Sequence, residues 1–144
     1  MLVYRYTSEK ELEHVLRHET SRIGDFNDDF TVWSRSNNHK YKYGHKYLHF
    51  FNHKKSIKYL RFARKKLESK KMFVCTYDIP QDVLKRGKGK GVYRMKPKGE
   101  WPEIRLNLTE YAIDIENFDC SWLVEVEKVQ PQDKLEHVSC LGQC

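Results

Sequence analysis

The chain has 144 residues, of which 39% are hydrophobic and 13% are aromatic, so it can form a core and is too aromatic for a disordered tail. Its length is typical of one domain. No stretch approaches the roughly 18 apolar residues of a membrane span, and because charge appears within the first five residues we expect no secretory signal. Four cysteines without a CxxC pair favour a reduced, cytoplasmic protein. We expect no membrane partner.

The net charge of +7 is unevenly distributed along the chain. Residues 40–98 carry 19 basic and three acidic side chains, whereas residues 100–144 carry three basic and ten acidic ones. A segment this cationic attracts polyanions such as nucleic acid, nucleotide or anionic membrane. The alternative is that the basic segment folds against the acidic third, which would cancel much of the field.

The first elements predicted from the sequence are a strand and a helix. Leu2–Tyr6 is β-branched and aromatic, as a short strand requires. Ser8 and Glu11 have the spacing of a capping box, in which Ser8 accepts from the third helical N–H and the Glu11 side chain reaches back. Apolar residues at helical spacing extend this helix to about His18–Ser21, and a long polar connection follows over residues 22–46.

The basic segment begins with a second strand and a cationic helix. Tyr47–Phe51 reads as a strand, and Asn52 can cap a helix from His53 to about Ser69. Residues 53–71 carry nine basic groups and one acid. Met72–Tyr77 alternates as a third strand, and Pro80 opens a single helical turn.

The remaining elements are predicted to be loops and strands. The GKGKG sequence at Gly87–Gly91 lies in a mobile loop over residues 85–100, with a strand at Val92–Met95. It lacks the pattern of a phosphate-binding loop, and a flexible hairpin loop is the simpler interpretation. Strands are expected at Ile104–Ile115 and Trp122–Val129. Strands outnumber helices, and the helices come early, so the fold class is α+β.

The histidines do not predict a metal site. His45, His49 and His53 are four residues apart, a spacing that aligns ligands only on a helix, and His49 lies in a predicted strand. His14 and His18 lie on a predicted helix, but their HVLRH sequence lacks the glutamate of a zinc-protease motif.

Basic residues interleaved with aromatic ones suggest a surface for nucleic acid, because aromatic rings can stack on bases. The alternative is that the basic residues form the solvated face of an amphipathic helix. The predicted nucleic-acid contacts are Lys54, Lys58, Arg61 and Lys65 of the helix and Lys88 and Lys90 of the loop.

Glu110 lies within LTEYAID, among residues typical of a strand. It is either the outward residue of a half-exposed strand or a carboxylate positioned to bind a hydroxyl or stabilise a developing cation. The spacing of the residues does not separate these two interpretations.

Four segments occur in an order that resembles the small ADP-ribosyltransferase-like domains, including the bacterial toxin and DNA-modifying branches. They are LVYRYTS, YLHFFNHKKSIKYL, MFVCTYDIP and TEYAID. The resemblance covers most of residues 2–127. It implies an α+β fold with N-terminal helices, in which two small, mostly antiparallel sheets pack around a cleft. It also implies a single domain over residues 1–130 and a C-terminal tail over residues 131–144.

The resemblance also implies the site residues. Arg5, with Thr7 beside it, matches the first-strand position that holds NAD, and we expect Tyr59 to add an aromatic ring to this cofactor-binding set. Tyr47 or His49 matches the second-strand position, and Glu110 matches the catalytic glutamate. NAD is then a substrate and no metal is expected. Such a site breaks the nicotinamide–ribose bond through an oxocarbenium-like state, which a carboxylate stabilises.

Two departures from the family pattern narrow the expected activity. Leu48-His49-Phe50 replaces a Ser-Thr-Ser sequence, and Leu108 stands two residues before Glu110, where many protein-modifying members have a second glutamate. Protein-arginine modification is therefore disfavoured, and a member that binds nucleotide without catalysis stays open.

The expected function is that of an NAD-dependent ADP-ribosyltransferase, a glycosyltransferase acting on nucleic acid or on a nucleic-acid-associated protein. A toxin or phage-defence role would bring a cognate inhibitor or antitoxin as a partner. The alternative is a non-enzymatic basic module that binds DNA, RNA or another partner.

Overall fold

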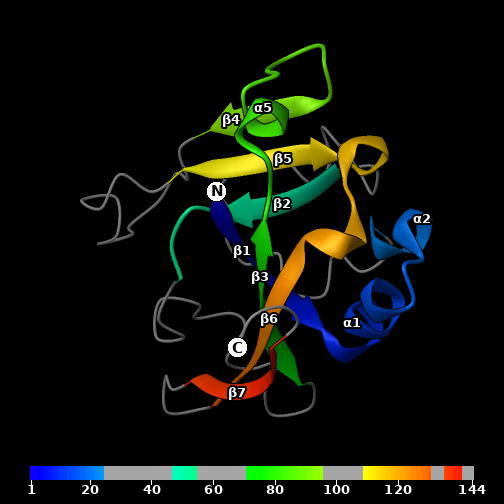
Figure 1. Ribbon diagram of the computed structural model, residues 1–144, viewed down its shortest axis with the longest axis vertical. Coiled ribbons are helices and arrows are strands. Elements are labelled where there is room, and N and C mark those ends of the chain that lie inside the picture. The colour runs from blue at the N-terminus through cyan, green and yellow to red at the C-terminus, as the bar shows by residue number, and fades with distance from the viewer. Residues whose placement is uncertain (25–46, 55–70, 96–108, 131–134, 141–144) are drawn as a thin grey trace.

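The computed structural model describes residues 1–24, 47–54, 71–95, 109–130 and 135–140 (Figure 1). Within these ranges the fold is α+β, as predicted. The elements are β1 (Leu2–Ser8), α1 (Glu9–Leu16), α2 (Thr20–Ile23), β2 (Tyr47–Phe51), β3 (Met72–Asp78), α5 (Gln81–Leu84), β4 (Val92–Met95), β5 (Glu110–Asp114), the 3-10 turns η6 (Ile115–Asn117) and η7 (Cys120–Trp122), β6 (Leu123–Val129) and β7 (Leu135–Cys140).

The strands form one sheet in the order β4-β5-β2-β1-β3-β6-β7, and every neighbouring pair is antiparallel. The prediction of two separate sheets is therefore wrong. The reason lies at the centre, where a single pair, Tyr4 opposite Phe51, joins β1 to β2, whereas seven pairs join β1 to β3. Two groups of strands thus meet at one narrow junction.

Several predicted elements have the expected positions. β2 spans the predicted residues, β1 and β3 extend slightly past theirs, and β4 matches its prediction. Ser8 caps α1, since its hydroxyl accepts from the Glu11 N–H at 3.3 Å. Pro80 precedes a helical turn, α5, which begins at Gln81. Residues 135–140, within the predicted tail, form β7 at the edge of the sheet.

Other predictions are altered or fall outside the described residues. The side-chain oxygen of Asn52 accepts from the Thr109 N–H at 2.8 Å, which ties the end of β2 to the start of β5. Most of the predicted helix at His53–Ser69 lies outside the described residues, as do residues 25–46. Of the strand predicted at Ile104–Ile115, the described part forms β5 over Glu110–Asp114.

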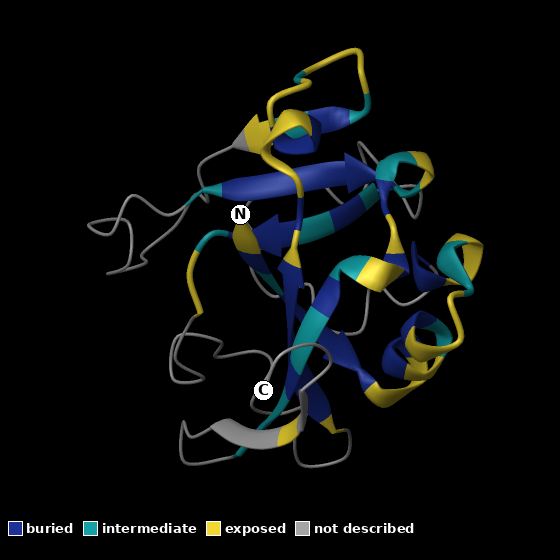
Figure 2. Ribbon diagram, in the orientation of Figure 1, coloured by how far each residue is buried: buried dark blue, intermediate teal, exposed yellow. Residues whose placement is uncertain are grey.

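The main hydrophobic core is formed by side chains of the sheet together with side chains of the helices. Leu12 and Val15 of α1 belong to it, as do Val83 and Leu84 of α5. Phe50 packs edge-on against Tyr77, with ring centroids 5.4 Å apart. Figure 2 shows that the central strands are buried while the connection between α5 and β4 is exposed. Among the described residues, no helix is long and apolar enough to cross a membrane.

Candidate functional site

The junction between β1 and β2 contains the most deeply buried charged residues of the described chain. Arg5 is 5% exposed, Glu11 is 0% exposed and Glu110 is 1% exposed. Buried ionic groups are costly unless they are paired and hydrogen-bonded, so each one needs a partner. We call Arg5, Glu11, His49 and Glu110 the junction cluster.

Arg5 and Glu11 form a two-pronged ion pair inside the protein. Arg5 donates from Nε to Glu11 Oε2 at 3.0 Å and from Nη2 to Glu11 Oε1 at 2.5 Å. The Thr7 hydroxyl donates to the same carboxylate. Burial lowers the pKa of Arg5, but the adjacent Glu11 carboxylate outweighs this effect and raises the pKa above its ordinary value. Arg5 is therefore held as a cation.

Glu11 has a different role from the one that the capping box predicts. Its backbone N–H donates to the Ser8 hydroxyl as expected, but its side chain turns inward to Arg5 and Thr7. The capping pattern alone does not mark Glu11 as a site residue. A usable signal was present, because a buried arginine in a strand needs a carboxylate nearby, and Glu11 follows it by six residues.

Arg5 also bridges the junction between the two groups of strands. Its Nη1 donates to the His49 carbonyl at 3.2 Å, and its Cζ lies 6.0 Å from the centre of the Phe50 ring. β1 and β2 diverge just beyond Tyr4 and Phe51, so a side chain supplies a hydrogen bond there. The guanidinium thereby couples α1 to the backbone of β2.

His49 and Glu110 come together from neighbouring strands. His49 Nδ1 lies 3.0 Å from Glu110 Oε1, although 61 positions separate them in the chain. Phe51 of β2 is paired with Glu110 of β5. His49 lies two residues from Phe51 on β2, so its side chain is on the same face of the sheet as that of Glu110. A carboxylate at Nδ1 favours the tautomer with its proton there, which leaves Nε2 as an acceptor.

Strand alternation assigns Arg5 to the other face of the sheet. Tyr4 is opposite Phe51, so the Tyr4 side chain shares the face of Phe51 and Glu110, and its neighbour Arg5 points the opposite way. The sequence-predicted residues therefore meet through the backbone of His49. The Arg5 guanidinium, expected to hold NAD, is engaged by Glu11 in this arrangement.

The other predicted cofactor and catalytic residues lie at different places. Tyr47 is on β2, and its ring packs edge-on against Tyr93 of β4 at 5.4 Å between centroids. Tyr47 shares the His49 face by alternation. Thr7 is buried and bonded to Glu11. Tyr59 lies outside the described residues.

The predicted nucleic-acid contacts separate into three groups. Lys88 and Lys90 are exposed on the connection between α5 and β4. Lys54 forms an ion pair with Glu127 of β6, and its ammonium lies 5.6 Å from the centre of the Tyr4 ring. Three further residues lie outside the described ranges, namely Lys58, Arg61 and Lys65.

Buried thiol and phenol groups surround the Arg5–Glu11 pair. Cys75 is opposite Arg5 in the β1–β3 register and is buried, as predicted. Burial raises the pKa of the Cys75 thiol well above its ordinary value, and it raises the pKa of Tyr77 in the same way. Both groups therefore stay protonated at neutral pH. No group of three or more metal-binding side chains occurs within the described ranges.

The His49–Glu110 pair places a carboxylate beside an imidazole in a region shielded from water. A carboxylate in a region of low dielectric interacts strongly with a nearby positive charge. The adjacent imidazole orients that carboxylate and presents a second polar atom.

Comparison of the chain with protein-family models, with curated proteins and with solved structures finds no match.

Proposed function

We propose that this protein is an NAD-dependent ADP-ribosyltransferase whose reacting centre is the His49–Glu110 pair. The supporting observation is the 3.0 Å approach of His49 Nδ1 to Glu110 Oε1 from adjacent strands. These are residues that the sequence resemblance matches to the second and third motif positions. The two side chains lie on one face of the sheet, which would allow them to act on the same substrate.

The reaction follows from the chemistry of a carboxylate beside a sugar. The bond between nicotinamide and the ribose carbon breaks, and nicotinamide leaves with the electron pair of that bond. Glu110 stabilises the positive charge that develops on the ribose. A lone pair of the acceptor then forms the new bond to that carbon, and the acceptor loses a proton to solvent.

Arg5 is a positioning residue in this proposal. It donates to the carbonyl of His49 and is itself fixed by Glu11. The imidazole is thus held by its own backbone on one side and by Glu110 on the other. Tyr47 and Tyr93 supply aromatic rings near this part of the sheet, and such a ring can stack on nicotinamide.

The test is incubation of the full chain with adenylate-labelled NAD and a panel of DNA, RNA and cell lysate. We expect release of nicotinamide and transfer of label to nucleic acid or to a nucleic-acid-associated protein. Glu110→Gln should lose both, while Glu116→Gln, which changes an exposed carboxylate in η6, should retain them. No nicotinamide release by the wild type, or equal release by Glu110→Gln, would overturn the proposal.

A second candidate function is a non-enzymatic nucleic-acid-binding module. The exposed side chains of Lys88 and Lys90 favour it. This function needs no NAD, and its nucleic-acid affinity would be unchanged by Glu110→Gln. Nicotinamide release that depends on Glu110 separates the first candidate from the second.

A further inference from the structure

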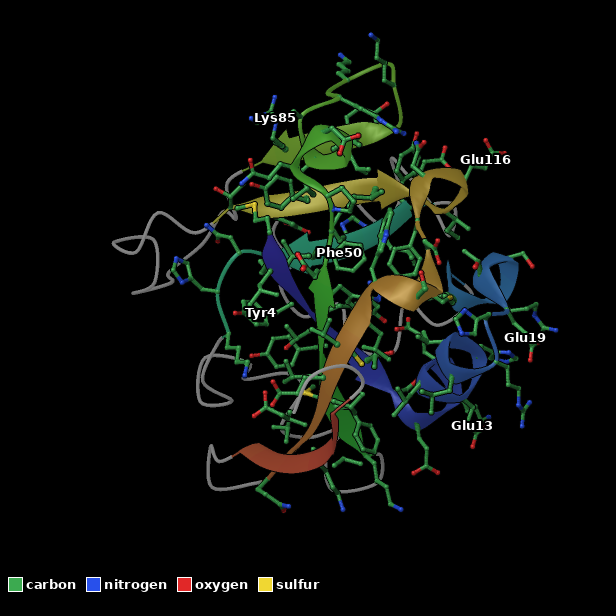
Figure 3. The ribbon with its side chains drawn as sticks, in the orientation of Figure 1. Tyr4, Glu13, Glu19, Phe50, Lys85 and Glu116 are labelled. Atoms are coloured by element: carbon green, nitrogen blue, oxygen red, sulfur yellow. The ribbon has the colours of Figure 1, made fainter. Side chains whose placement is uncertain are left out.

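The connection from α5 to β4 presents the densest positive charge among the described residues. We call residues 85–91 the lysine loop. Its four cations, Lys85, Arg86, Lys88 and Lys90, are all exposed. Figure 2 shows this connection as an exposed projection at one end of the sheet, and Figure 3 shows Lys85 extending from the surface.

The backbone of the lysine loop has a defined shape. Gly87, Gly89 and Gly91 have φ of 82°, 86° and 79°, a region that glycine adopts without steric cost. The Gly87 carbonyl accepts from the Lys90 N–H at 3.1 Å and from the Val92 N–H at 3.4 Å. Lys88 and Lys90 are thereby presented between glycines on a tight turn.

Asn117 of η6 clamps this loop to the sheet. Its side-chain oxygen accepts from Arg86 Nη1 at 2.8 Å, and its Nδ2 donates to the Lys90 carbonyl at 3.3 Å. The Gly91 carbonyl accepts from the Asp114 N–H at 2.8 Å. A Cβ at Gly91 would lie 2.2 Å from Asn117 Nδ2, so the lysine loop and η6 are in close contact at this point.

The charges of the lysine loop are displayed rather than neutralised. Within the part of the chain that the structure describes, no carboxylate lies within ion-pair distance of Lys85, Lys88 or Lys90. By contrast, Lys54 pairs with Glu127, and Lys71 Nζ lies 3.4 Å from Glu9 Oε2. The clamp partner of the loop, Asn117, is neutral, so it fixes the loop without cancelling its field.

We propose that the lysine loop binds the phosphate backbone of nucleic acid. Lysine side chains and exposed backbone N–H groups are typical ligands of phosphate oxygens. Stable protein interfaces need buried aromatic or aliphatic anchors. The exposed large hydrophobic residues of the described chain lie elsewhere, at Met1, Leu2, Leu16 and Val138. A polyanion with regularly repeated charges fits this surface better than an apolar partner does.

The lysine loop is hydrogen-bonded to the end of β5, the strand that carries Glu110. Asp114 closes β5 and bonds to Gly91, while Glu110 opens the same strand. Four residue steps of about 3.3 Å place these two positions about 13 Å apart along the strand. Binding by the loop is nevertheless independent of NAD chemistry, and it is tested without NAD.

The experiment measures fluorescence anisotropy of a labelled 20-nucleotide single strand, and of the matching duplex, with the full chain at several salt concentrations. Lys88→Glu/Lys90→Glu is compared with Lys10→Glu/Arg17→Glu, which makes the same change of net charge at exposed positions on and after α1. We expect the loop variant to bind at least tenfold more weakly. We also expect its salt dependence to be shallower by about 1.5 in log–log slope, as the loss of two phosphate contacts requires.

A charge-neutral variant tests the shape of the loop. Asn117→Ala removes the clamp without changing net charge, and we expect a several-fold loss of affinity. Equal affinity of the Lys88→Glu/Lys90→Glu variant and the wild type would overturn the proposal. An equal loss in the Lys10→Glu/Arg17→Glu control, or binding to phosphatidylserine vesicles without binding to either oligonucleotide, would also overturn it. These outcomes leave nicotinamide release by Glu110 unaffected, so the two proposals fail separately.

Discussion

The junction cluster and the lysine loop use positive charge in opposite ways. At the junction, Arg5 is 5% exposed and its guanidinium is occupied by Glu11 and by the backbone of His49. In the loop, Lys88 and Lys90 face solvent on a turn that a neutral asparagine holds in place. The buried charge stabilises one arrangement of strands, while the exposed charges remain available to a ligand.

This difference shows that net charge along the sequence does not locate binding surfaces. The cationic middle of the chain is neutralised in part, because Lys54 pairs with Glu127 of the acidic third. The lysine loop belongs to the same cationic segment and has no such partner among the described residues. Local geometry decides whether a basic side chain is paired with a carboxylate or exposed to solvent. The following predictions test that distinction.

The largest effect is expected from breaking the buried ion pair. Arg5→Met leaves the Glu11 carboxylate buried without its counter-ion and should lower the free energy of unfolding by about 3–5 kcal/mol. Arg5→Met/Glu11→Leu removes both charges and should recover most of that loss. Lys88→Met, in the loop, should change stability by no more than about 0.5 kcal/mol. Urea denaturation measures all three.

Similar effects of Arg5→Met and Lys88→Met on stability would contradict the distinction between buried and exposed charge. A double variant at Arg5 and Glu11 that is no more stable than Arg5→Met alone would also contradict it. Either result would mean that the junction charges are solvated rather than paired.

The next largest effect concerns the shape of the lysine loop. Gly89→Ala places a side chain at positive φ with open space around it and should cost about 1–2 kcal/mol. Gly91→Ala adds a collision with Asn117 and should cost about 1 kcal/mol more, since a hydrogen bond of the clamp is lost. Thermal unfolding of both variants measures the difference. Equal costs would show that Asn117 does not clamp the loop.

The buried thiol opposite Arg5 predicts a dependence of stability on pH. Burial raises the pKa of Cys75, so the folded state keeps a proton that the unfolded state loses above its thiol pKa of about 8.5. The contribution to stability is therefore complete below about pH 8.5 and falls as pH rises further, by at most about 1.4 kcal/mol per pH unit. Denaturation of wild type and Cys75→Ala between pH 8 and 10 measures this slope, which should be shallower in the variant. A slope that Cys75→Ala leaves unchanged would contradict this assignment.

The smallest effect is expected at the ion pair between Lys54 and Glu127. Both side chains keep some contact with water, 34% for Lys54 and 12% for Glu127, so screening limits their interaction. A double-mutant cycle with Lys54→Met and Glu127→Gln should give a coupling energy of about 0.2–1 kcal/mol. A coupling as large as that between Arg5 and Glu11 would remove the distinction between buried and surface pairs.

Local sequence patterns predicted the local structure well. The alternation of Leu2–Tyr6, Tyr47–Phe51 and Met72–Tyr77 marked three strands, and Ser8 marked the start of a helix. Proline before a helical turn was equally informative at Pro80. These features depend on residues close together in the chain, so they are readable without knowing what packs against them.

The arrangement of the sheet and the partners of the charges were less predictable. One pair at Tyr4 and Phe51 decides whether there is one sheet or two, and no local pattern encodes a single pair. The contact between His49 and Glu110 depends on the register of two strands far apart in sequence. The spacing of Ser8 and Glu11 predicts only a capping role for Glu11, although tertiary structure directs its side chain to Arg5.

The central claim, that NAD binds at the His49–Glu110 pair, is tested most directly by nuclear magnetic resonance of the histidine side chains. His49 is compared with His14, a half-buried histidine on α1 that lies 3.2 Å from Glu19 rather than from Glu110. The account predicts that titration with NAD shifts the imidazole resonances of His49 and leaves those of His14 unchanged, with the His49 shift lost in Glu110→Gln. Unchanged His49 resonances at saturating millimolar NAD, or equal shifts at both histidines, would contradict it.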